Sequence, residues 1–182
     1  MLFRKQNYGF TLVETIAVLI IVGIFSALAT PNLFGLYRQY QLTNAFRDLE
    51  SSIKISQKQA KRLGITCKIK LDRIDISGEI RNRIAVVNSS DPGERGKNYS
   101  RCLIEEKVFP EFIELETNIP GSTNKIVFSH KGNTTTSGTI KLSIKNLDLD
   151  RCLVISNGLG IIRTGRYRST KPKLTSKDCK RE

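Results

Sequence analysis

The stretch GFTLVETIAVLIIVGIFSALATP, from Gly9 to Pro31, decides how the chain begins. Residues 10–30 are almost all apolar, and a helix of this length, rising about 1.5 Å per residue, matches the roughly 30 Å hydrocarbon core of a bilayer. Glu14 breaks the pattern, and a carboxylate within such a helix persists when it gains a partner. The stretch therefore predicts a transmembrane helix whose one charged side chain has a specific role.

Two processing sites compete in this region. The sequence Ala27-Leu28-Ala29 matches an A-x-A signal-peptidase site, and a cut there would release a soluble exported protein that starts at Thr30. Glu14 argues against this cut, because a charge in the apolar core of a signal peptide costs a few kcal/mol of insertion. The other cut, between Gly9 and Phe10, keeps the apolar helix on the mature chain.

The residues GFTLVE resemble the prepilin cleavage motif of type IV pilins and type II secretion pseudopilins. The resemblance implies that prepilin peptidase removes the leader 1–9 after Gly9 and that the new N-terminal residue, Phe10, is methylated. It also implies that Glu14 pairs with the N-terminal amine of a neighbouring subunit, since an unpaired Glu14 would lie bare in lipid. Pro31 stands where pilins often carry a helix-disrupting proline.

The pattern after Pro31 predicts an α+β fold. Apolar residues recur at helical spacing and predict an amphipathic continuation of the helix over residues 31–64, with Gly64 as its stop. The stripe consists of Leu42, Ala45, Phe46, Leu49, Ile53, Ala60 and Leu63. Past Gly64 the period is two, which predicts an antiparallel β domain over residues 65–162 that packs on the helix. Strands are expected at residues 65–72, 79–87, 100–109, 125–129, 138–144 and 151–156. One long helix, half in the membrane and half on a β-sheet head, is the layout of the pilin fold.

The last predicted strands resemble one branch of that family. KIVFSHKGNTTTSGTIKLSI and RCLVISNGLGIIRTGRYR are similar to the C-terminal half of FimT/GspH-type minor pilins. There a strand ending in Phe precedes a glycine-containing turn, then GTI-x-L, a V-x-I-S strand and a glycine-basic ending. The resemblance covers the N-terminal helix and residues 125–168.

Residues 163–182 form a predicted basic C-terminal tail. They carry eight Lys or Arg against Asp178 and Glu182, a net charge of +6 in a chain whose net charge is +13. Such a balance favours an anionic partner. In an extended segment Arg166 and Arg168 point to the same side about 6.6 Å apart, a spacing that suits successive phosphates, and Tyr167 is placed to stack on an exposed base. The predicted DNA-binding residues are Arg163, Arg166, Tyr167, Arg168, Lys171 and Lys173.

The motif GRYR at 165–168 also resembles the G-R-x-R element of DNA-binding FimT-type minor pilins. GIIR at 160–163 is a second candidate for the same element. Against DNA binding stands a plainer interpretation, in which the tail is a solvated basic segment that contacts water or anionic lipid.

Four cysteines are present and none forms a C-x-x-C pair, so neither a zinc site nor a thioredoxin-type pair is indicated. An even number of widely spaced cysteines in an exported chain suits two disulfides. Because pilins often close their C-terminal region with a disulfide, the resemblance implies a Cys152–Cys179 bridge, which leaves Cys67 with Cys102. The residues themselves leave the other pairings open.

The sequence contains no catalytic constellation, since G-x-S-x-G, H-E-x-x-H and P-loop motifs are all missing and His130 stands alone. We therefore expect no enzyme activity, cofactor or metal. The resemblance implies a minor type IV pilin, held in the inner membrane by one helix with a periplasmic domain, then assembled with other pilins into an extracellular pilus that binds DNA during natural transformation. The alternative is a structural minor pseudopilin of a type II secretion system that binds no DNA.

Overall fold

The fold comes from a computed structural model that describes residues 11–88, 91, 93–94, 98–121, 124–144, 147–168 and 173–181, without the side chains of 28–32 and 148. The chain divides into two compact units, Met1–Arg38 and Gln39–Glu182. The elements are helix α1 (Leu12–Leu63), a short 3-10 helix (Ser100–Cys102) and strands β1 (Cys67–Ile76), β2 (Glu79–Val86), β3 (Lys107–Val108), β4 (Ile113–Thr117), β5 (Lys125–Phe128), β6 (Gly138–Ile144), β7 (Leu147–Ile155), β8 (Ile162–Tyr167) and β9 (Cys179–Lys180). The order is the predicted one, a long N-terminal helix followed by antiparallel sheets.

The N-terminal unit contains the first part of α1. Its start is held by Thr11, whose Oγ1 accepts a hydrogen bond from the Glu14 N–H at 3.3 Å. The Glu14 side chain and the apolar side chains that follow it are exposed. Within the part of the chain that the structure describes, no helix is long and apolar enough to cross a membrane. Gly9 and Phe10, the predicted cleavage site, lie outside the described residues, and so does the side chain of Pro31.

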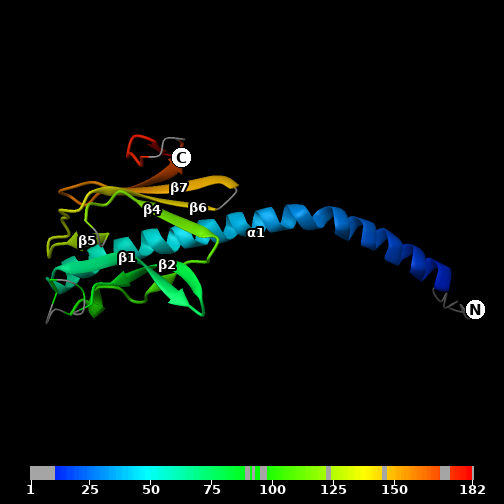
Figure 1. Cartoon of the computed structure of the whole chain (residues 1–182), viewed down its shortest axis with the longest axis horizontal. Helices are drawn as coiled ribbons and strands as arrows, with labels where there is room; N and C mark the ends of the chain where they lie inside the picture. Colours follow the sequence, from blue (N-terminus) through cyan, green and yellow to red (C-terminus); the bar gives the residue numbers. More distant parts are fainter. Residues whose placement is uncertain are drawn as a thin grey trace, which may run out of the picture. The chain divides into compact units, whose positions relative to one another are not determined.

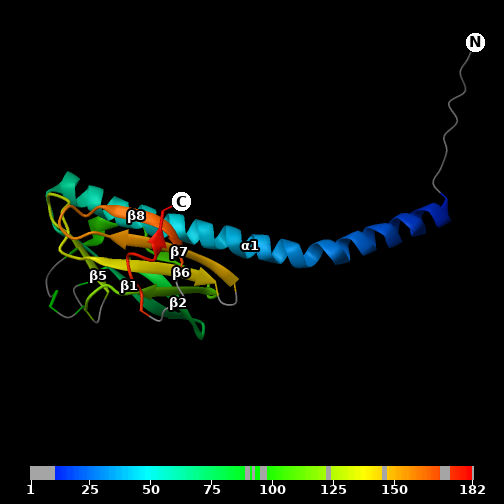
Figure 2. The same cartoon turned by 90° about the horizontal axis from the view of Figure 1, so that it is seen from above.

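The C-terminal unit places the second part of α1 against two antiparallel sheets (Figure 1). Sheet A has the strand order β3-β2-β1-β5, and sheet B has the order β4-β6-β7-β8-β9. Figure 2 shows that this part of α1 runs along one side of both sheets. The predicted packing of a helix on a β domain is confirmed.

The core of the C-terminal unit forms between the helix stripe and the two sheets. Leu49 and Ile53 are fully buried on α1, and the other stripe residues from 42 to 60 are buried as predicted. Both sheets contribute side chains to the same core: Ile69, Ile84, Ile126, Phe128, Ile113, Ile140, Leu142, Leu153 and Ile155. Each buried aliphatic side chain of this size stabilises the fold by about 1.5–3 kcal/mol.

One helix side chain ties α1 to two turns of the β domain. Gln57 Nε2 donates to Gly132 O at 2.8 Å and to Gly160 O at 3.1 Å. Both glycines adopt positive φ, which favours glycine over other residues. A side chain on Gly160 would also collide with the Gln57 amide, because its Cβ would lie 2.8 Å from Nε2. The two turns therefore need glycine at these positions to meet the helix.

Both disulfides that the resemblance implied are present. Cys67 and Cys102 join with a Cα–Cα distance of 5.4 Å, and Cys152 and Cys179 join with a Cα–Cα distance of 5.8 Å. The first attaches the segment after β2 to β1, and the second attaches the C-terminal segment to β7.

The strand predicted at residues 100–109 is wrong over most of its length. Residues 100–102 form a 3-10 helix, and only the two residues of β3 are extended in a ladder. The disulfide anchors Cys102 next to β1, but β1 already pairs with β2 on one side and β5 on the other. No ladder position beside β1 is left, so this segment forms a turn of helix instead.

Three strands were not predicted as strands. In β4 the sequence IELET alternates glutamates with apolar residues on a short segment between turns. β8 and β9 fall within the predicted basic tail, so the boundary expected between residues 162 and 163 lies inside β8. The end of the domain is therefore part of sheet B rather than an appendage to it.

Candidate nucleic-acid interface

Strand β8 carries the first of the predicted DNA-binding residues. Because side chains alternate along a strand, Arg163 and Tyr167 lie on one face of sheet B and Arg166 lies on the other. Arg168 follows β8 and lines one pocket together with Arg166. The structure therefore brings Arg166 and Arg168 together and places Arg163 on the opposite face.

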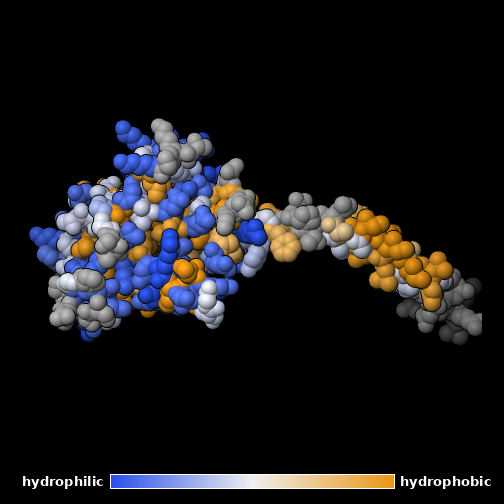
Figure 3. Space-filling view, viewed as in Figure 1, coloured by the Kyte–Doolittle hydropathy of each residue, from blue (hydrophilic) through white to orange (hydrophobic). Residues whose placement is uncertain are grey.

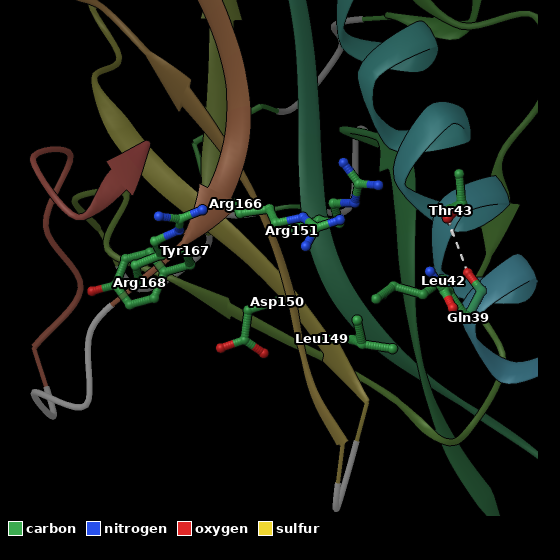
Figure 4. A pocket seen from close by; sticks show the side chains of 9 residues that line it. All are labelled: Gln39, Leu42, Thr43, Leu149, Asp150, Arg151, Arg166, Tyr167 and Arg168. Atoms are coloured by element: carbon green, nitrogen blue, oxygen red, sulfur yellow. Dashed lines mark hydrogen bonds between the residues drawn. The ribbon is translucent and has the colours of Figure 1, made fainter. Parts of the chain in front are cut away.

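Arg166 and Arg168 line a pocket of about 160 Å³ between sheet B and α1 (Figure 4). The α1 wall consists of Gln39, Leu42 and Thr43, and the sheet wall consists of Leu149, Asp150, Arg151, Arg166, Tyr167 and Arg168. Figure 4 shows the Arg151 and Arg166 side chains between the strands and the helix, and Arg168 beside Tyr167, farther from the helix. On the helix, Thr43 Oγ1 donates a hydrogen bond to Gln39 O at 2.9 Å. Three arginines and one aspartate among these residues make the pocket cationic.

Arg151 is the pocket residue that sequence reasoning missed. It stands at the beginning of the RCLVIS segment, and its partner across the β7–β8 ladder is Arg166. The sequence signal was only a basic residue at the start of a predicted strand. Nothing in the sequence indicated which residue of another strand lies beside it. Like charges directly opposite each other in a sheet are destabilising, which makes this pair conspicuous.

The structure corrects the role predicted for Tyr167. Tyr167 is 7% exposed. Its hydroxyl group accepts a hydrogen bond from the Thr175 N–H at 3.3 Å and donates one to Lys173 O at 3.5 Å. The Lys141 ammonium lies 5.6 Å from the centre of the ring. A ring enclosed in this way is not available to stack on a base, so Tyr167 fixes the C-terminal segment instead.

Lys141 belongs to a charged cluster on the Tyr167 face of sheet B. Its Nζ lies 3.3 Å from Asp150 and 3.5 Å from Glu116. Burial opposes the charged form, but the negative charges of Asp150 and Glu116 outweigh it and hold the pKa of Lys141 above its ordinary value. The positive charge of Lys141 is thus matched by two carboxylates.

The C-terminal segment is held firmly on sheet B. The Arg168 N–H donates to Asp178 O at 2.9 Å, and Asn118 Nδ2 donates to Leu174 O at 2.9 Å. Gly165 leaves room for the crossing chain, because a Cβ at this position would lie 2.0 Å from Lys180 O. With the Cys152–Cys179 bridge, these contacts fix the backbone that carries the basic side chains; Lys173 is exposed there, whereas Lys171 lies outside the described residues.

Two lysines of sheet A form ion pairs with carboxylates. Lys68 pairs with Glu94 at 2.5 Å, and Lys70 pairs with Asp91 at 2.9 Å. Burial works against the charged form of Asp91, but hydrogen bonds from Lys70 and from the Asn88 N–H hold the pKa of Asp91 below its ordinary value. The positive charges of Lys68 and Lys70 are therefore balanced by carboxylates nearby.

Over the described ranges, no three His, Cys, Asp or Glu side chains come close enough together to hold a metal ion.

A comparison with protein-family models matches residues 4–30 to the prokaryotic N-terminal methylation motif. The matched range includes the predicted cleavage site and Glu14. The motif supports a type IV pilin-like protein that is processed by prepilin peptidase and assembles with other pilins, a structural protein rather than an enzyme. Neither a comparison with curated proteins nor one with solved structures found a match.

Proposed function

We propose that this chain is a minor pilin of the FimT/GspH type, anchored in the inner membrane through residues 10–30 and then built into a type IV pilus. Its C-terminal unit binds DNA without sequence preference, as in the uptake step of natural transformation. The observation that carries the DNA-binding part is a basic segment attached to a sheet by a disulfide.

The N-terminal unit supports assembly through its exposed apolar side chains. Leu19 is 70% exposed and Phe25 is 68% exposed, and Figure 3 shows the apolar surface that such residues form on this part of α1. A continuous apolar surface of this kind marks a contact with lipid or with other protein chains. In the proposed pilus, Glu14 pairs with the N-terminal amine that cleavage creates on Phe10 of a neighbouring subunit.

The basic segment supports the binding of phosphates. Its described residues, 162–168 and 173–181, contain seven Lys or Arg and one acidic residue, Asp178. β9 pairs with β8 only at Arg166 and Tyr167, so the first half of β8 lies along the edge of sheet B. Arg163 therefore lies on this open edge, whereas Arg166 lies where β9 pairs with β8. Because the disulfide orders the segment beforehand, less entropy is lost on binding.

The test of DNA binding uses the full chain in detergent and a short fluorescent duplex, with anisotropy measured from low to high salt. We expect affinity to fall steeply with salt, because contacts to phosphates release counterions. The double variant Arg166→Gln/Arg168→Gln should bind more weakly, with a salt slope flatter by up to about two. The matched control is Arg73→Gln/Arg81→Gln in sheet A, which removes the same charge elsewhere.

Two results would count against this function. If the wild-type chain does not bind DNA even at low salt, the protein fits a structural minor pseudopilin of a type II secretion system better. If the Arg166/Arg168 variant and the control bind equally well, the DNA site lies elsewhere on the chain.

Processing has a separate test in the mass of the mature protein. Cleavage after Gly9 predicts an N-terminal methylated Phe10, whereas signal-peptidase cleavage predicts a free Thr30. Detection of Thr30 would exclude a pilus subunit, because the helix needed for assembly would be lost.

A further inference from the structure

Basic residues form a row across three adjacent strands of sheet B. Arg151 on β7 pairs with Arg166 on β8, and Arg166 pairs with Lys180 on β9. Neighbouring strands lie about 4.8 Å apart, so the three backbone positions follow one another at that spacing. Like charges directly opposite each other destabilise a sheet. An anion bound between them would turn this repulsion into a stabilising attraction.

The pocket brings several basic residues to one place. Among its described lining residues are Arg151, Arg166 and Arg168 and one acidic residue, Asp150. Guanidinium groups are planar and present several N–H donors in a fixed fork, a geometry that matches the oxygens of a phosphate group. The chemistry of the pocket wall therefore selects a compact anion.

The other wall of the pocket comes from α1. Gln39, Leu42 and Thr43 line it there, and the pocket volume of about 160 Å³ is large enough for a phosphate group. The wall belongs to the part of α1 that packs on the core, with Leu42 2% exposed. The pocket is thus built from rigid elements on both sides.

We propose that this pocket binds one phosphate group, and that Arg151 is a phosphate-contacting residue together with Arg166 and Arg168. The inference deepens the proposed function, on which it rests for the source of the phosphate, the backbone of DNA. It adds a contact from β7 to a site that sequence reasoning placed only on residues 163–173.

The first measurement is the DNA affinity of the full chain in detergent, comparing Arg151→Gln with the matched charge control Arg73→Gln. A charge-assisted contact of this kind predicts that Arg151→Gln weakens binding about tenfold and lowers the salt slope by up to about one. Arg73→Gln should match the wild type. Because Arg151 and Arg166 would hold the same phosphate, the double variant should lose less than the product of the two single losses.

The second measurement needs no DNA. Inorganic phosphate is titrated into the isotope-labelled chain while the Nε–H signals of its arginines are followed by NMR. A saturable shift of the Arg151 and Arg166 signals, abolished in Arg151→Gln, supports the pocket. If Arg151→Gln fails to fold, Arg151→Lys takes its place: it keeps the charge but loses the fork, so it should bind phosphate more weakly than the wild type does.

The outcomes separate the two proposals. DNA binding that Arg151→Gln and Arg73→Gln leave equally strong overturns the pocket and leaves the proposed function standing. A phosphate-dependent shift at Arg151 without DNA binding supports the pocket and overturns the proposed function. If neither DNA binding nor a phosphate-dependent shift is observed, both proposals are wrong. If Arg151→Lys binds phosphate as tightly as the wild type does, the pocket proposal is wrong.

Discussion

Removing the Cys152–Cys179 disulfide should destabilise the globular unit and weaken DNA binding together. The two cysteines are 27 residues apart in the sequence. On the chain-entropy model a loop of this length contributes about 3.5 kcal/mol to the free energy of unfolding. Alanine is the suitable replacement, because Cys152 is fully buried and a serine hydroxyl there would lack a partner.

The effect on binding follows from what else holds the segment. β9 contributes two residues to the ladder, and the hydrogen bonds from Arg168 to Asp178 and from Asn118 to Leu174 are worth about 1 kcal/mol each. These contacts are too few to order the segment as tightly as the disulfide does. In Cys152→Ala/Cys179→Ala the segment should become ordered only on binding, at a cost in affinity.

The matched control is Cys67→Ala/Cys102→Ala, whose cysteines are 35 residues apart. The same model gives about 3.8 kcal/mol for that loop, which carries none of the predicted DNA-binding residues. Urea denaturation followed by circular dichroism measures stability, and fluorescence anisotropy measures DNA affinity. Both variants should lose similar stability, and only the Cys152/Cys179 variant should lose affinity. Equal losses of affinity in the two variants, or a loss of stability below about 1 kcal/mol in the first, would refute this reasoning.

Three further predictions concern the fold. Leu49→Ala leaves a cavity at a fully buried position and should lower the free energy of unfolding by about 2–5 kcal/mol in the same urea assay. Gly165→Ala should displace the chain at Lys180 O, and hydrogen exchange should show faster exchange after residue 173 with little change in α1. Because the folded pKa of Asp91 is lowered, its contribution to stability is present above its unfolded pKa near 4 and is lost as the pH falls through the folded value. The thermal midpoint of Asp91→Asn should therefore depend less on pH below about 4; an unchanged acid dependence would assign the effect to other carboxylates.

Local patterns predicted most of the elements of this chain. The helix stripe through Leu49 and Ile53 and the period-two segments that became β1, β2, β5, β6 and β7 each depend on residues close together in the sequence. Such periodicity determines which face of a helix or strand is apolar, whatever the rest of the chain does. The methylation motif belongs to the same class of information, because it is a contiguous stretch.

The failures lie where a residue's surroundings depend on distant segments. Residues 100–109 have a strand-like pattern, but β1 had no free side to pair with them. Tyr167 is an aromatic residue between two arginines in the sequence, which suggested that it stacks on a base. In the structure, however, the segment around Thr175 covers it.

The chain by itself thus determined its processing motif, its helix, most of its strands and the surplus of positive charge near its end. Only the tertiary structure decided that Arg151 lies beside Arg166, that Arg163 faces away from them and that Tyr167 is enclosed. The physical reason is that strand register and disulfide bonds join residues that lie far apart in the sequence. The core as a whole selects the register, because a slip by one residue would turn every apolar side chain of a strand toward water.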